Sequence, residues 1–204
     1  FSTELAPKNL VGIPWRVAFA LQADGWYLRQ DIIWAKPNPM PESVTDRCTK
    51  AHEYIFLLAK SERYYFDQGA ISEPTTDPEY RTVGKIRPTA EGGEGFEIRG
   101  GLHSQPGGRV SRNRRSVWSV SPAQFSEAHF ATFPPKLIEP CILAGCPEGG
   151  TVLDPFSGSG TTGLVSIQHQ RKYIGIELNP EYVAMSNRRL TAASAQGKLF
   201  GATA

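Results

Sequence analysis

The sequence predicts a three-layer α/β fold with a Rossmann-like sheet, and three observations lead to this class. The first is an apolar strand end at residues 152–154 that turns through several glycines into the start of a helix. The second is a short apolar run at residues 172–177, which completes a strand–helix–strand unit. The third is a helix pattern near the N-terminus, followed by strand patterns that predict an antiparallel hairpin at the sheet edge.

The turn in the strand–helix–strand unit has the spacing Gly158-x-Gly160-x-x-Gly163. Glycines there allow positive φ angles and the close approach of a ligand to the backbone, and the free N–H groups of the following helix point at that ligand. Nineteen residues after Gly158, Glu177 ends the second strand. A carboxylate at that position can bind the two hydroxyls of a ribose. The unit is therefore predicted to bind a nucleoside, with a glycine-rich turn that binds nothing as the alternative.

The acid at the end of the first strand, Asp154, indicates which nucleoside. The glycine spacing alone also fits the dinucleotide fingerprint. Asp154 would face the pyrophosphate of a dinucleotide at close range, which is an unfavourable contact between like charges. S-adenosylmethionine carries a sulfonium and an ammonium group and no phosphate, so Asp154 and Glu177 both complement it. We expect this cofactor, with an NAD-dependent oxidoreductase as a distant alternative.

Three motifs then occur in the order of a known family: residues 129–136, residues 154–162 and residues 175–177. In these motifs the chain resembles the β-type DNA amino-methyltransferases, and the resemblance extends over about residues 10–190. It implies the transfer of a methyl group from S-adenosylmethionine to N6 of adenine or N4 of cytosine. The substrate would be double-stranded DNA with a flipped target base.

The resemblance also implies an order of segments and a set of cofactor-binding residues. Residues 1–67 would be the remainder of the catalytic half, 68–116 a target-recognition insertion, and 117–204 the cofactor-binding half. The expected cofactor-binding residues are Thr132, Phe133, Asp154, Phe156, Gly158, Ser159, Gly160, Thr161 and Glu177.

The middle segment is rich in glycine, proline and charge, and it is too poor in large apolar residues to form its own core. It ends in a run of seven residues that contains no acid and four arginines: Arg109, Arg112, Arg114 and Arg115. Such a run is typical of phosphate contact, and arginine can also pair with guanine. We expect these residues to bind DNA, with a solvated charged surface as the alternative.

A second candidate DNA contact follows the first predicted strand, where three prolines alternate in a stiff loop at residues 36–41. The resemblance implies that this loop borders the pocket of the flipped base, with Lys36, Asn38 and Ser43 as its polar groups. A rigid connector is the alternative. His52 beside Glu53 is more typical of a structural histidine than of a catalytic one.

Local patterns predict the remaining elements. A helix is expected over residues 10–23 with Asn9 as its cap, and a strand over 26–35. A hairpin is expected between residues 52–59 and 64–66, and a strand over 117–121. Two further helices are expected over residues 134–144 and from 180 to about 195.

One part that the resemblance implies is absent from the sequence. Such enzymes use an Asp/Asn/Ser-Pro-Pro-aromatic tetrapeptide that accepts the amine hydrogens and stacks on the base. Neither Phe133-Pro-Pro-Lys136 nor Asn179-Pro-Glu-Tyr182 fits it. In the β-type order it would precede Phe1, so we expect a fragment that binds the donor without transferring its methyl group, or a chain completed by a missing segment or a homodimer. The alternative is a non-catalytic module that binds DNA and cofactor.

Composition adds the expected class and compartment. A formal net charge of +2 neither indicates nor excludes nucleic acid, because a basic face can lie within a balanced total. The three cysteines, Cys48, Cys141 and Cys146, have no metal-binding spacing. No long apolar run and no signal pattern occurs. We therefore expect a cytoplasmic protein that uses no metal and does not enter a membrane.

Overall fold

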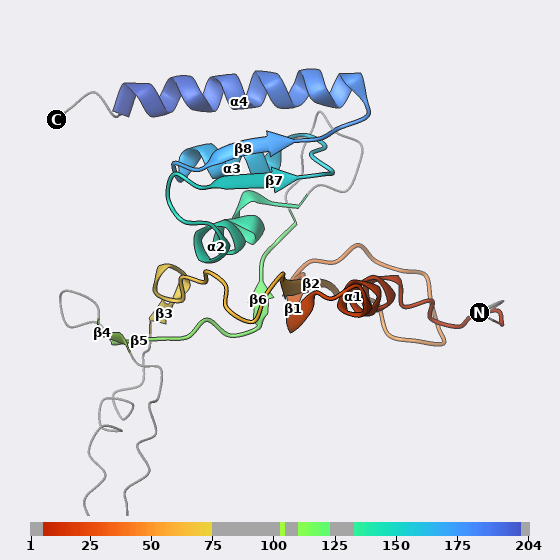
Figure 1. Ribbon diagram of the computed structural model, residues 1–204. Helices are drawn as coiled ribbons and strands as arrows, with labels where there is room; N and C mark the ends of the chain where they lie inside the picture. The colour runs from red at the N-terminus through yellow and green to blue at the C-terminus, as the bar shows by residue number, and fades with distance from the viewer. Residues whose placement is uncertain (1–5, 75–102, 105–109, 123–132, 201–204) are drawn as a thin grey trace, which may run out of the picture.

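The computed structural model describes residues 6–74, 103–104, 110–122 and 133–200, and its elements form two groups (Figure 1). One group contains α1 (Ile13–Ala23), β1 (Tyr27–Ala35), β2 (His52–Ala59) and β6 (Val117–Ser119). The other contains α2 (Pro135–Gly145), β7 (Thr151–Asp154), α3 (Thr161–Gln168), β8 (Lys172–Gly175) and α4 (Pro180–Phe200). Helices and parallel strands alternate in the second group, and the α/β class is confirmed.

The described strands form three ladders. β1 lies between β2 and β6, and it pairs antiparallel with β2 and parallel with β6. β7 and β8 pair in parallel, with α3 as their crossover. Figure 1 shows α3 behind this strand pair, and α3 packs against both α2 and α4. The strand–helix–strand unit of the sequence prediction is therefore present, and α4 packs against its helix.

The first helix begins later than predicted. Its N-cap is Gly12, which has a φ of 67°, and a proline lies in the first turn. The expected cap, Asn9, lies in a preceding turn where its backbone N–H bonds to the carbonyl of Ala6 at 3.2 Å. Glycine at the cap supplies the left-handed conformation, so the apolar residues before it stay outside the helix.

The predicted hairpin between residues 52–59 and 64–66 is wrong in its pairing. β2 is indeed antiparallel and lies at the edge of its ladder, but its partner is β1. Residues 64–66 form no strand. The ring of Tyr64 lies on β1 instead, because the Nε of Arg29 donates to its hydroxyl at 3.1 Å and the guanidinium lies 5.8 Å from the ring centre. An aromatic run can thus pack against a neighbouring strand without forming a strand itself.

The main hydrophobic core joins the two groups of elements. Its buried members come from β1, β6 and α2: Ile32, Trp34, Trp118 and Leu137. Both indole N–H groups are satisfied, since Trp34 donates to the carbonyl of Val120 at 2.7 Å and Trp118 donates to that of Arg115 at 2.8 Å. A buried indole N–H needs such a partner. Here both acceptors are carbonyl groups next to β6, so the hydrogen bonds connect the segment that contains β6 to the core.

The middle segment carries short strands where loops were expected. Its described part contains the one-turn helix η1 (Gly69–Ile71) and the ladder of β3 (Glu73–Pro74), β5 (Val110–Arg112) and β4 (His103–Ser104). The other predicted helices and the strand at 117–121 are present, with α4 extending further than expected. Among the described residues, no helix has the length and apolar character needed to cross a membrane.

Candidate functional site

The glycine turn between β7 and α3 has the predicted backbone conformation. Gly158 and Gly160 have φ angles of 51° and 77°, and Gly160 is the N-cap of α3. The turn is closed by two backbone hydrogen bonds, from Gly160 N–H to the Ser157 carbonyl at 2.8 Å and from Ser157 N–H to the Ile176 carbonyl at 2.9 Å. The first N–H groups of α3 have no acceptor within their own helix, so they face the outside of the turn.

Close packing behind the turn explains why small residues occur there. A Cβ added to Gly160 would lie 3.0 Å from the Cβ of Ser186 on α4. A Cβ on Gly163 would lie 2.5 Å from the ring of Tyr173 on β8. The third glycine of the motif is thus a packing residue that lets α3 approach the strand, as in other nucleotide-binding units.

Two carboxylates lie at the carboxyl end of the β7–β8 pair. Asp154 pairs in register with Gly175, two residues before Glu177. One oxygen of Asp154 accepts the N–H of Phe156 at 3.0 Å. Glu177 accepts the N–H of Gly158 at 2.8 Å through one oxygen and that of Asn179 at 2.9 Å through the other.

The backbone hydrogen bonds to Glu177 favour its ionised form. The N–H of Asn179, followed by that of Gly158, holds the pKa of Glu177 below its ordinary value. Glu177 therefore stays ionised well below neutral pH and is held against the glycine turn. Each carboxylate oxygen can accept more than one hydrogen bond, so acceptor capacity remains for a ligand.

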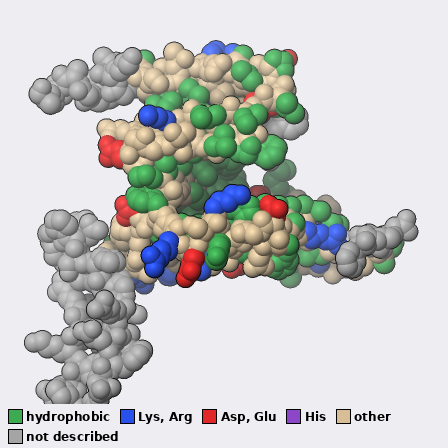
Figure 2. Space-filling model, viewed as in Figure 1, with side chains coloured by type: hydrophobic (Ala, Val, Ile, Leu, Met, Phe, Trp, Pro, Cys, Tyr) green, Lys and Arg blue, Asp and Glu red, His purple; other side chains and the backbone are tan. Residues whose placement is uncertain are grey.

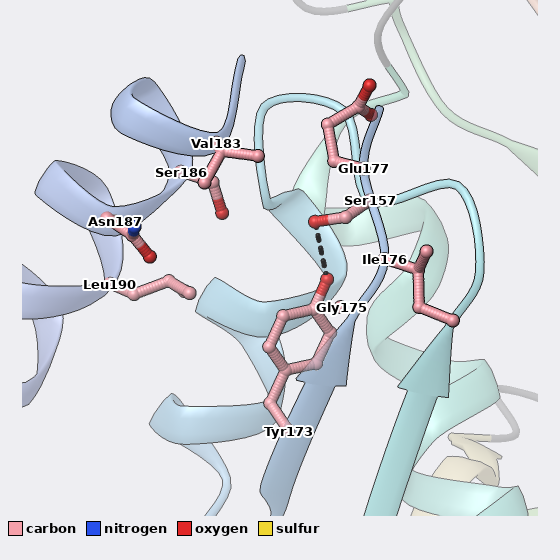
Figure 3. A pocket seen from close by; sticks show the side chains of 9 residues that line it. All are labelled: Ser157, Tyr173, Gly175, Ile176, Glu177, Val183, Ser186, Asn187 and Leu190. Atoms are coloured by element: carbon pink, nitrogen blue, oxygen red, sulfur yellow. Dashed lines mark hydrogen bonds between the residues drawn. The ribbon is translucent and has the colours of Figure 1, made fainter. Parts of the chain in front are cut away.

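A pocket of about 460 Å³ lies between the end of β8 and α4 (Figure 3). Its residues are Ser157, Tyr173, Gly175, Ile176, Glu177, Val183, Ser186, Asn187 and Leu190. Figure 3 shows the hydroxyls of Ser157 and Tyr173 meeting across it, and their oxygens are 2.8 Å apart. Burial, together with the charge of Asp154, raises the pKa of Tyr173 although the bond with Ser157 opposes this. The volume lies in the range of ligand pockets.

The other expected cofactor-binding residues differ in their exposure to solvent. Phe156 is 88% exposed beside the two acids. Ser159 and Thr161 are both buried, and their hydroxyl oxygens lie 3.5 Å apart. Phe133 packs against the main core. Thr132 lies outside the described residues.

The charged and polar groups of this site fit S-adenosylmethionine better than a dinucleotide. Two acids lie at the end of the strand pair, beside a turn whose N–H groups can meet a carboxylate and beside the exposed ring of Phe156. The acids complement the sulfonium and ammonium groups and would repel a pyrophosphate. No group of three His, Cys, Asp or Glu side chains suited to a metal occurs among the described residues.

The arginines expected to bind DNA are held by partners within the chain. Glu73 accepts from Arg115 at 3.0 Å and lies 3.5 Å from the Nε of Arg112. The guanidinium of Arg114 lies 4.8 Å from the ring centre of Trp118. Arg109 lies outside the described residues. One carboxylate against three guanidiniums leaves a positive excess at this surface.

Glu73 was missed by sequence reasoning because it lies 42 positions before Arg115 in a segment without periodicity. Burial disfavours its ionised form, but the hydrogen bonds from Arg115 and the charges of both arginines outweigh that effect and hold its pKa below the ordinary value. It is therefore an ionised partner of Arg112 and Arg115 at neutral pH.

The proline loop offers a different set of polar groups. The ammonium of Lys36 forms an ion pair with Glu53 and lies 4.5 Å from the ring centre of Trp34. Asn38 and Ser43 are exposed. The charge of Lys36 is thus paired with Glu53 at the end of the β1–β2 ladder, and the loop presents amide and hydroxyl groups more than charge.

Sequence reasoning also missed Arg189 on α4. Its Nη1 donates to the Ser159 hydroxyl at 2.9 Å and to the carbonyl of the same residue, with the Thr161 hydroxyl 3.5 Å away. Arg189 lies 30 positions from Ser159, in a helix without a recognised motif, so no local signal could have linked them.

Comparisons with known proteins agree with this geometry. The type II methyltransferase M.Cfr9I of Citrobacter freundii is 52% identical over 186 residues, which are 91% of this chain and 52% of that protein. The type II methyltransferase M.SmaI of Serratia marcescens is 46% identical over 186 residues, or 91% of this chain and 54% of that protein. The chain therefore spans about half the length of these curated relatives.

A solved structure shares the fold. The cytosine-N4-specific PvuII DNA methyltransferase matches with a TM-score of 0.63 and 21% identity, over 96% of this chain and 66% of that one. The family model for DNA methylases of the N6/N4 type matches residues 3–188. Together with the glycine turn and its two acids, this match shows that the chain belongs to the N6/N4 DNA methylase family.

Proposed function

We propose that this protein transfers a methyl group from S-adenosylmethionine to the exocyclic amine of adenine or cytosine in double-stranded DNA. The observation that carries the proposal is the glycine turn with Asp154 and Glu177 at one end of the β7–β8 pair. The 52% identity to a type II methyltransferase supports the same reaction. DNA as substrate is consistent with a site of action in the cytoplasm.

In the proposed binding mode the donor lies across the carboxyl ends of β7 and β8. Glu177 is held by two backbone N–H groups and accepts from the ribose hydroxyls. Asp154 keeps one oxygen for a cationic group of the donor, since the other is bonded to Phe156. The ring of Phe156 is exposed beside the two acids and would be free to cover the donor.

When bound, S-adenosylmethionine supplies a sulfonium methyl group that a nucleophile can take. Transfer requires that group to be held in line with the amine at near-attack distance, and positioning of this kind can supply roughly 7–11 kcal/mol of a barrier. This chain supplies the donor-binding residues, whereas the acceptors for the amine belong to the Asp/Asn/Ser-Pro-Pro-aromatic tetrapeptide that the sequence lacks. In the transfer the amine nitrogen would bond to the methyl carbon, the carbon–sulfur electron pair would stay on sulfur, and a proton would leave the amine. The target base is flipped out of the duplex so that the amine can reach the donor.

DNA is proposed to approach through the surface of Arg109, Arg112, Arg114 and Arg115, with Lys36, Asn38 and Ser43 near the flipped base. The positive excess around Glu73 supports this use of the arginines. The exposed amide and hydroxyl of the proline loop suit contact with a base edge more than contact with a phosphate.

The test is calorimetric titration of the protein and its variants with S-adenosylmethionine. Asp154→Asn keeps an acceptor for the N–H of Phe156 and removes only the charge. We expect it to weaken binding by about tenfold, as for the loss of one charged hydrogen bond. Glu177→Gln keeps one carbonyl oxygen and should bind more weakly than the unaltered protein but more tightly than Glu177→Ala.

A matched control is Asp24→Asn, which removes a carboxylate at the C-cap of α1 in the other group of elements. It should leave donor affinity unchanged. Equal affinity in Asp154→Asn and the unaltered protein would remove Asp154 from the donor site. Tighter binding of a nicotinamide dinucleotide than of S-adenosylmethionine would overturn the proposed function.

A further inference from the structure

The side chain of Arg189 reaches from α4 to the back of the glycine turn. Its Nη1 donates to the carbonyl and the hydroxyl of Ser159, and Ser159 and Thr161 are both buried at this contact. The N–H on the other side of the same peptide unit, that of Gly160, donates to the Ser157 carbonyl at 2.8 Å. The peptide unit between Ser159 and Gly160 is therefore bonded at both ends.

A peptide unit next to glycine is easily reoriented, because glycine accepts positive and negative φ angles alike. Gly158 and Gly160 flank Ser159. The backbone of the turn would therefore tolerate an orientation in which this plane is flipped and the N–H groups of the turn are directed elsewhere. The peptide group is planar, so a bond to its carbonyl also fixes the direction of its N–H. Arg189 supplies that bond from outside the turn.

Arg189 contacts the N-terminal end of α3, where the helix dipole disfavours positive charge. Its hydrogen bonds to the Ser159 carbonyl and hydroxyl oppose that effect, since a guanidinium can donate to several acceptors in one plane.

We propose that Arg189 is a positioning residue for cofactor binding, which locks the Ser159–Gly160 peptide unit in the orientation that the donor requires. The inference rests on the proposed function, because it assigns Arg189 to the same donor site. Arg189 acts through the turn, from the face of the turn that α4 covers. Donor affinity thus depends on a residue of α4 that belongs to none of the sequence motifs.

The test compares Arg189→Met, Arg189→Lys and a matched control, Arg188→Met, which removes the neighbouring exposed arginine of α4. Calorimetric titration with S-adenosylmethionine should show about tenfold weaker binding in Arg189→Met, as expected when a charge-assisted hydrogen bond is lost. Arg189→Lys should recover part of the affinity, because an ammonium can still donate to the Ser159 carbonyl. Arg188→Met should bind like the unaltered protein.

A second measurement separates positioning from general stability and does not need the donor. Amide hydrogen exchange at residues 157–161 should be faster in Arg189→Met than in the unaltered protein. The melting temperature of the protein, which includes the β1–β2 ladder, should be the same in both. Unchanged exchange in the turn would overturn the proposal whether or not the donor binds. A lowered melting temperature with unchanged donor affinity of the folded protein would also overturn it, since Arg189 would then be only structural. Failure of the unaltered protein to bind the donor, with faster exchange in Arg189→Met, would instead count against the proposed function.

Discussion

The glycine turn and the arginine surface differ in what holds their functional groups. In the turn, backbone N–H groups fix Asp154 and Glu177, and the positive φ angles come from two glycines. At the arginine surface, the side chains of Arg112 and Arg115 share one carboxylate, that of Glu73. The two carboxylates of the proposed donor site are therefore held by the backbone, whereas the arginine surface is held by exchangeable side-chain pairs.

This difference bears on how each region can act. A backbone-fixed carboxylate needs no reorganisation when the donor arrives, which lowers the entropic cost of binding. To bind a phosphate, an arginine paired with Glu73 would have to exchange that partner, and surface pairs of this kind are weak enough for the exchange. Figure 2 shows hydrophobic side chains around the hollow between the two groups of elements and several charged side chains on the lower group.

The largest effect should come from a change that breaks the turn itself. Gly160→Ala places a methyl group against Ser186 in a residue with a φ of 77°. We expect about 1–2 kcal/mol from the left-handed conformation. Overpacking against α4 should cost roughly 1–3 kcal/mol more. Denaturant unfolding would measure the loss, and donor binding should fall with it.

The chain offers a matched control for the backbone contribution. Gly12 has a φ of 67°, but an added Cβ there would meet nothing within 4 Å. Gly12→Ala should therefore show only the conformational cost. Ser186→Gly should relieve part of the loss in Gly160→Ala by removing the clashing side chain. An equal loss in Gly12→Ala and Gly160→Ala would show that the packing of α4 against the turn contributes nothing.

The sequence predicted the turn well because its determinants are local. Positive φ at Gly158 and Gly160, the start of α3 and the carboxylate at the end of β8 all follow from residues within one strand–helix–strand unit. What escaped prediction is the support from α4. Ser186 and Arg189 contact the turn across about thirty positions, and neither has a spacing that marks it.

The other misses have the same physical origin. The predicted hairpin rests on adjacent apolar runs, but β2 pairs with β1 instead. Tyr64 contacts β1 through its hydrogen bond with Arg29. The arginine run was identified by composition, which cannot reveal that Glu73 pairs with two of its members. Which of the predicted cofactor and DNA residues touch their ligands stays a prediction.

A smaller effect is expected when the arginines are removed. Replacing Arg109, Arg112, Arg114 and Arg115 by alanine should weaken DNA binding and flatten its salt dependence, by a slope of up to about 0.9 for each lost phosphate contact. Fluorescence titration of duplex DNA at several salt concentrations would measure this. Arg188→Ala should leave the slope unchanged as the control. An unaltered slope in the fourfold variant would show that these arginines are solvated surface charges, whereas lost sequence preference would mark base contacts.

The smallest expected effect concerns Glu73, which would compete with DNA phosphates for Arg112 and Arg115 if these arginines bind DNA. Glu73→Gln should tighten DNA binding by roughly twofold to fivefold, the range for releasing partly exposed ion pairs. The gain should depend on pH with a definite sign. Because the pKa of Glu73 is lowered in the folded protein, its ion pairs are fully present above the ordinary pKa of glutamate and are lost as the pH falls through the lowered value.

The affinity of the unaltered protein should therefore approach that of Glu73→Gln at acid pH, and the two should differ most near neutrality. Titrations of duplex DNA at fixed salt across this range would follow the difference. Glu42→Gln is the control, since Glu42 pairs with Arg47 at 2.6 Å outside the arginine run. Weaker DNA binding by Glu73→Gln at neutral pH would reverse the interpretation, because Glu73 would then orient the two arginines toward DNA instead of competing with it.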